Sequence, residues 1–65
     1  MPFTFGKLID VVNFCIDEVD TDYPDYGPSL RRLVKIAEYM AAMLPNVSVQ
    51  DALGILKKLD CIIVS

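Results

Sequence analysis

The prolines of this chain divide it into three segments, and each segment has the periodicity of an amphipathic helix. Pro24 and Pro28 lie in the first break and Pro45 lies in the second. Proline cannot continue a helix, because it lacks the backbone N–H and its ring clashes with the preceding turn. We therefore expect helices over residues 5–19, 29–44 and 48–59, joined by loops of about nine and three residues, as is typical of packed helices.

Each segment repeats apolar residues at three- and four-residue spacing, which places them on one face of a helix. Ser29 and Ser48 stand at the start of the second and third segments, where serine is a favourable N-cap. Asp51 follows Ser48 at the spacing of a capping box. The faces predicted to form the core are Phe5, Leu8, Ile9, Val12, Cys15, Ile16 and Val19, then Leu30, Leu33, Val34, Ala37, Ala41 and Leu44, and finally Val49, Ala52, Leu53, Leu56 and Leu59.

This pattern predicts an all-α fold, a small three-helix domain with a short C-terminal apolar tail, in which residues 1–65 form one domain. The tail covers residues 61–64 and contains Ile62 and Ile63. Its β-branched residues favour extended structure, although a last helical turn packed on the core fits as well. A partner chain could cover an apolar terminus of this kind.

The size of the chain leaves little room for its apolar side chains. A domain of 65 residues buries only about 60% of the surface of its unfolded chain. The hydrophobic fraction is 54%, against about 45–50% in ordinary domains. The excess must partly lie on the surface, where a contiguous apolar patch usually marks an interface. We therefore expect a homodimer, most simply a symmetric one.

The second segment is apolar over an arc of about 220°, which is wider than a core-facing helix needs. Either this helix lies in the middle of the domain, or part of the arc contacts a partner. Methionine and tyrosine are common at binding surfaces, and Phe14 lies opposite the apolar face of the first segment. The predicted interface therefore comprises Phe14, Ile36, Tyr39, Met40, Met43, Ile62 and Ile63, and the solvated strip of the second segment comprises Arg31, Lys35, Glu38 and Ala42.

Five acidic residues lie within nine positions, from the end of the first segment into the loop that follows it: Asp17, Glu18, Asp20, Asp22 and Asp25. They do not fit an EF-hand loop, because Asp25 and Arg31 stand where that loop needs Gly and Glu. Three interpretations remain. The cluster is a solvated loop whose aspartates favour the N-terminus of the next helix, a weak cation site, or an acidic docking loop for a basic partner, where opposite charge speeds encounter.

Residues 42–55 also have the spacing of a helix-turn-helix. A recognition helix that begins at Ser48 would present Gln50, Asp51 and Gly54, and glutamine can read adenine. Asp51 would repel phosphates, however, and only Lys57 and Lys58 add positive charge. With a net charge of −3, binding to nucleic acid or to anionic membrane surfaces is disfavoured.

The sequence offers little for catalysis. It contains no histidine, which is the commonest general base, and no nucleophile with an activating neighbour. Cys15 and Cys61 are too few for a zinc site. They either form a disulfide with each other or, as the simpler interpretation, are two reduced thiols that act as small hydrophobes. We expect neither metal nor cofactor. No apolar run approaches the roughly 18 residues of a membrane span, and no secretory signal is recognised, so we expect a cytoplasmic protein.

Together these features predict a small, non-enzymatic protein–protein interaction module that self-associates and has a regulatory or inhibitory role. Its expected partners are a second copy of itself and one further, basic protein. The alternatives are an atypical, acidic helix-turn-helix DNA-binding regulator and a structural subunit of a larger complex.

Overall fold

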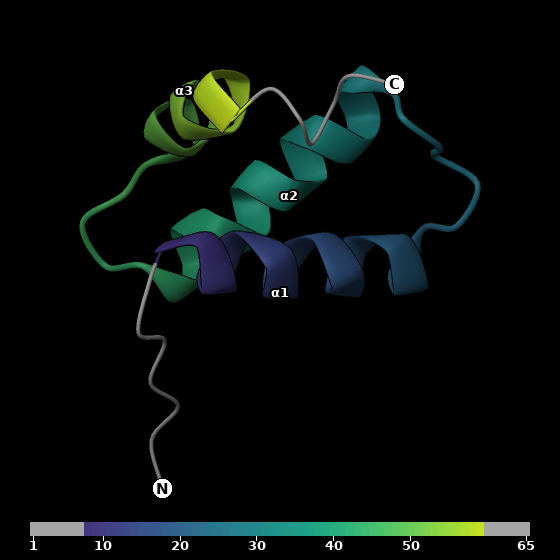
Figure 1. The fold of residues 1–65 in the computed structure, drawn as a ribbon, viewed down its shortest axis with the longest axis horizontal. Helices are drawn as coiled ribbons and strands as arrows, with labels where there is room; N and C mark the ends of the chain where they lie inside the picture. The colour runs from purple at the N-terminus through teal and green to yellow at the C-terminus, as the bar shows by residue number, and fades with distance from the viewer. Residues whose placement is uncertain (1–7, 60–65) are drawn as a thin grey trace, which may run out of the picture.

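The computed structural model describes residues 8–59, which form three helices: α1 (Leu8–Asp22), α2 (Leu30–Met43) and α3 (Val49–Leu59). Figure 1 shows α2 crossing the molecule between α1 and α3, and α2 packs against both of them. The described range contains no strand, so the predicted all-α, three-helix class is confirmed. The predicted apolar tail, with Ile62 and Ile63, lies outside the described residues.

α1 continues beyond its predicted end at Val19. The helix ends at Asp22, and the N–H of Tyr23 still bonds to the carbonyl of Val19 at 2.8 Å. Pro24 disfavours helical geometry only at the residue before it, so the restriction falls on Tyr23 and not earlier. In the connection that follows, Gly27 adopts a positive φ of 60°, a conformation that costs glycine little and strains other residues.

α2 begins and ends where the caps predict. The hydroxyl of Ser29 accepts a hydrogen bond from the N–H of Arg32 at 3.4 Å. At the other end the N–H of Leu44 bonds to the carbonyl of Met40 at 2.9 Å. Leu44 itself is extended, as expected for a residue before proline. The predicted range 29–44 is therefore the helix together with its two capping residues.

α3 starts with the predicted capping box. The N–H of Asp51 donates to the hydroxyl of Ser48 at 3.1 Å, and the N–H of Ser48 donates to the Asp51 carboxylate at 3.4 Å. This reciprocal pair satisfies two donors that the helix itself leaves without partners.

The core is entirely apolar among the described residues. At 100° per residue, its face on α2 is rotated by about 60° from the predicted one. The reason is that the face of α2 covered by its neighbours is the one that carries Ile36 and Met40, and the strip on the opposite side stays exposed. The buried residues are Val11, Val12, Cys15 and Val19 of α1, Leu33, Ile36, Ala37 and Met40 of α2, and Ala52 and Leu56 of α3.

Several predicted core residues are instead exposed. Leu30 is 71% exposed, Leu8 45% and Ile9 39%, whereas Val11, which was not predicted to be buried, is almost fully enclosed. A periodic pattern shows that a helix has an apolar face but does not show how far its neighbours cover that face.

Candidate functional site

An open groove of about 410 Å³ lies between α1 and α2. α1 contributes Phe14 and Glu18, and α2 contributes Glu38, Tyr39, Ala42 and Met43. The lining is mainly apolar, and the charges that border it are both negative. We refer to these six residues as the acidic groove.

The helical periodicity of both elements builds this groove. Phe14 and Glu18 are four residues apart on α1, as are Tyr39 and Met43 on α2, so each pair shares a helix face. Phe14, Tyr39 and Met43 are partly buried and pack against the core. The groove is therefore a preformed surface whose apolar side chains are kept in place by packing against the core.

Cys15 supports one wall of the groove from the core. Its fully buried Sγ lies 3.7 Å from the Sδ of Met43. Burial, and to a lesser extent the charge of Glu18, raises the pKa of this thiol. Cys15 is a free cysteine, and in its protonated form it acts as a packing residue and not as a nucleophile.

Tyr39 is oriented by a hydrogen bond to the end of α1. Its hydroxyl donates to the carboxylate of Asp22 at 2.6 Å. This bond is the main reason that the pKa of Tyr39 is raised to about 12, because ionisation would remove the donated proton. The bond connects Tyr39, which lines the acidic groove, to Asp22 at the end of α1.

Asp20 and Arg32 form a bidentate ion pair near the Tyr39–Asp22 hydrogen bond. The Arg32 Nε donates to Asp20 Oδ1 at 2.6 Å and its NH2 group donates to Oδ2 at 3.0 Å. The hydrogen bonding lowers the pKa of Asp20 and raises the pKa of Arg32. The pair joins the last turn of α1 to the first turn of α2.

The structure brings together only part of the predicted interface. Phe14, Tyr39 and Met43 meet in the acidic groove, but Ile36 and Met40 are 0% exposed and belong to the core. This corrects the expectation that those two side chains contact a partner: their side of α2 packs on α1 and α3. Ile62 and Ile63 lie outside the described residues.

The predicted acidic loop is mostly helical, which is a second correction. Asp17, Glu18, Asp20 and Asp22 lie on α1, and only Asp25 lies in the connection to α2. Two of the five carboxylates have partners within the chain, because Asp20 binds Arg32 and Asp22 accepts from Tyr39. Glu18 lines the acidic groove, and Asp17 and Asp25 are exposed.

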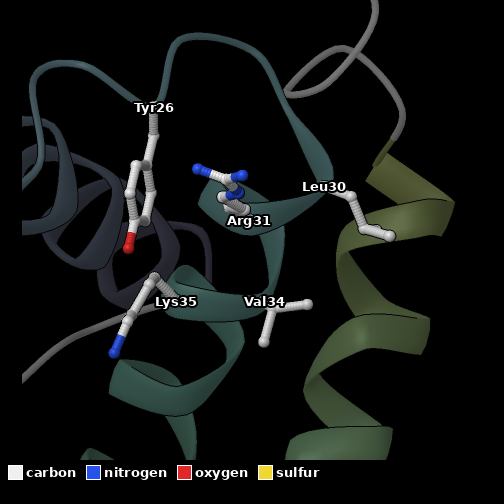
Figure 2. A pocket seen from close by; sticks show the side chains of 5 residues that line it. All are labelled: Tyr26, Leu30, Arg31, Val34 and Lys35. Atoms are coloured by element: carbon white, nitrogen blue, oxygen red, sulfur yellow. The ribbon is translucent and has the colours of Figure 1, made fainter.

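A second hollow, of about 310 Å³, lies at the first half of α2 and is lined by Tyr26, Leu30, Arg31, Val34 and Lys35. Figure 2 shows Tyr26 and Lys35 on one side of this surface, Leu30 and Val34 on the side toward α3, and Arg31 between them. We refer to these five residues as the basic patch. Sequence reasoning missed it, because Leu30 and Val34 were assigned to the core. The sequence feature that could have indicated this patch is the pair Arg31 and Lys35, four residues apart and directly following Leu30 and Val34.

Two tyrosines order one side of the basic patch. The rings of Tyr23 and Tyr26 stack with centroids 4.8 Å apart and an interplanar angle of 13°. The Nζ of Lys35 lies 5.2 Å from the centre of the Tyr23 ring, within range of a cation–π interaction. Lys35 also contacts Glu38, with 3.4 Å between Nζ and Oε1.

The α3 residues that the helix-turn-helix interpretation would place against DNA are exposed, and the charges of this face are mixed. Gln50, Asp51 and Gly54 are exposed, as are Lys57 and Lys58. The Asp51 carboxylate is engaged in the capping box at Ser48.

Within residues 8–59, no three metal-ligating side chains form a group that could hold a metal ion. The helices of this part of the chain are also too short or too polar to cross a membrane. Comparison with protein-family models, curated proteins and solved structures gave no match to this chain.

Proposed function

We propose that this chain is a non-enzymatic protein–protein interaction module that self-associates and has a regulatory or inhibitory role. The observation that supports this most directly is the acidic groove. Three of the residues expected to contact a partner, Phe14, Tyr39 and Met43, come from two helices and line one open surface.

The physical properties of the groove fit binding. Aromatic and methionine side chains provide large apolar contact areas, and methionine adapts to irregular partners. Tyr39 is already oriented by Asp22, so less side-chain freedom is lost when a partner binds. Phe14, Tyr39 and Met43 pack against the apolar core behind the groove, so the binding surface is supported by the fold.

The proposal is tested by blocking the groove without disturbing the core. Ala42 lines the groove and is exposed, so Ala42→Arg adds a bulky charge there at small cost to folding. Gln50→Arg is the matched control, because Gln50 is exposed on α3 and the change adds the same charge elsewhere. Helicity by circular dichroism should be equal in both variants.

Light scattering across micromolar concentrations should give the wild type and Gln50→Arg twice the monomer mass and Ala42→Arg the monomer mass. A wild type that stays monomeric throughout this range contradicts self-association. An Ala42→Arg variant that dimerises like the wild type contradicts a role for the groove.

The proposal also includes one further, basic partner in the cytoplasm. The exposed carboxylates of Asp17 and Asp25 support it, since opposite charge speeds encounter and favours correct partners. A suitable probe is a helical peptide with leucines along one face and lysines on both sides of them. Asp17→Lys/Asp25→Lys should weaken its binding in a low-salt titration, and unchanged affinity would reject the basic partner.

A further inference from the structure

We propose that two copies of this chain pair through the exposed strip of α2, with the two α2 helices antiparallel, so that the basic patch of each copy lies against the acidic groove of the other. This inference rests on the proposed self-association and adds the surface and the orientation. The basic patch is the component that the sequence did not indicate.

The charges along α2 favour the antiparallel orientation. Arg31 and Lys35 lie in its first half, and Glu38 lies in its second half, where Glu18 of α1 adds another negative charge at the acidic groove. In a parallel pair, like charges of the two copies would face each other. In an antiparallel pair each basic half faces an acidic half, an arrangement that favours one orientation over the other.

The spacing of the exposed strip allows this pairing. Its four residues, Arg31, Lys35, Glu38 and Ala42, are separated by four, three and four positions, which is the spacing of a seam between two packed helices. With the two-fold axis between Ile36 and Ala37, Lys35 lies opposite Glu38 of the partner copy and Arg31 lies opposite Ala42 of the partner copy. The small side chain of Ala42 permits close approach of the two backbones.

The same register also covers apolar surface. At this offset Leu30 lies level with Met43 of the partner copy, and Val34 lies level with Tyr39 of the partner copy. Leu30 is 71% exposed, the largest exposed fraction among the large hydrophobic side chains of the described residues. Covering it removes apolar area from water, which is the general driving force of association.

The Lys35–Glu38 ion pair within one copy opposes the pairing of two copies only weakly. Lys35 and Glu38 are 3.4 Å apart, and their side chains are 33% and 47% exposed. Exposed pairs of this kind contribute little to stability. Lys35 can therefore exchange its contact with Glu38 of its own chain for one with Glu38 of the partner copy, in a less hydrated setting where the attraction is stronger.

The test uses two variants of opposite charge. Arg31→Glu/Lys35→Glu makes the basic patch acidic, and Glu18→Lys/Glu38→Lys makes the acidic groove basic. Each variant alone should dimerise at least about tenfold more weakly than the wild type, because like charges now face each other. An equimolar mixture of the two should recover the dimer mass in light scattering, and native mass spectrometry should identify it as one copy of each.

The control for the first variant is Lys57→Glu/Lys58→Glu, which makes the same change of net charge on the exposed end of α3 and should dimerise nearly as the wild type does. Circular dichroism should show equal helicity for all variants. Raising the salt concentration should weaken the wild-type dimer, because salt screens exposed charges.

The outcomes separate this inference from the proposed function. A wild-type chain that is monomeric at every concentration overturns both. A wild type that dimerises, with an Arg31→Glu/Lys35→Glu variant that dimerises equally well, overturns only the antiparallel pairing, because the basic patch is then outside the interface. A mixture that stays monomeric, or a wild type that grows beyond the dimer, overturns the pairing as well.

Discussion

The hydroxyl of Tyr39, in the second half of α2, donates a hydrogen bond of 2.6 Å to the carboxylate of Asp22, the last residue of α1. This bond exists because α1 continues to Asp22 and does not end at Val19. It orients one side chain of the acidic groove and, with the Asp20–Arg32 pair, connects the end of α1 to α2.

The Tyr39–Asp22 bond should be measurable by alkaline titration. It raises the pKa of Tyr39 to about 12, whereas an unfolded tyrosine has a pKa of about 10. The stability that it contributes is therefore fully present below a pH of about 10 and is lost as the pH rises through the folded value. In a Tyr23→Phe/Tyr26→Phe background, where Tyr39 is the remaining tyrosine, Asp22→Asn should lower the pKa of Tyr39, as read by ultraviolet absorbance. A pKa that does not move would show that Asp22 is not the acceptor.

The Asp20–Arg32 ion pair should make the free energy of unfolding depend on pH in the acidic range. Arg32 lowers the pKa of Asp20, so the contribution is present above the unfolded value of about 3.9 and is lost as the pH falls through the folded value. Because the Asp20 side chain is 48% exposed, Asp20→Asn should cost less than about 1 kcal/mol at neutral pH. Urea unfolding should show the wild type and the variant converging in acid. A difference that persists at the lowest pH would contradict this account.

The buried position of Ile36 predicts a stability effect in place of a binding effect. Ile36→Val removes one methylene from a fully buried side chain and should lower the free energy of unfolding by about 0.5–1.5 kcal/mol. Leu30→Ala, at an exposed position, should change the stability of the monomer by less than about 0.5 kcal/mol. Both are measured by urea unfolding at concentrations below the dissociation constant of the dimer. Equal effects at the two positions would refute the rotated core face of α2.

The capping box at the start of α3 predicts a local loss of stability. Ser48→Ala removes the acceptor of the Asp51 N–H and should cost about 1 kcal/mol. Asn46→Ala, in the same exposed connection, serves as the control. If thermal unfolding shows the two variants to be equally stable, the Ser48 hydroxyl does not cap the helix.

The mixed charge on the exposed face of α3 predicts weak interaction with DNA. Lys57 and Lys58 are the cations of this face, and Asp51 opposes them. Because phosphate neutralisation supplies most non-specific affinity, fluorescence titration with duplex DNA at low salt should detect no binding at micromolar concentrations. Salt-dependent binding would favour the helix-turn-helix alternative over the interaction module.

The number and type of the elements could be predicted because they depend on local chemistry. Pro24, Pro28 and Pro45 separate the segments, and Ser29 and Ser48 cap the second and third helices through bonds to their own first turns. In the predicted solvated strip, Arg31, Glu38 and Ala42 are exposed and Lys35 is half-buried. Its charged residues could be placed from the sequence because charged side chains rarely lie inside a small core.

The candidate site was only partly predictable. Phe14, Tyr39 and Met43 were selected as excess apolar residues and do line one groove. Ile36 and Met40 were selected on the same reasoning and are core residues. Nothing local distinguishes Met40 from Met43, because both lie on the same wide apolar arc and only the positions of α1 and α3 decide which one is covered.

The amino-acid sequence by itself determined three amphipathic helices, their caps and the charges along α2, because these depend on residues within one or two turns of each other. Only the tertiary structure decided which side of α2 is buried, that Asp22 reaches Tyr39, and that Leu30 lies exposed beside Arg31. The physical reason is that each helix has more apolar surface than one neighbour can cover, so the part that remains exposed depends on how the other two helices pack against it.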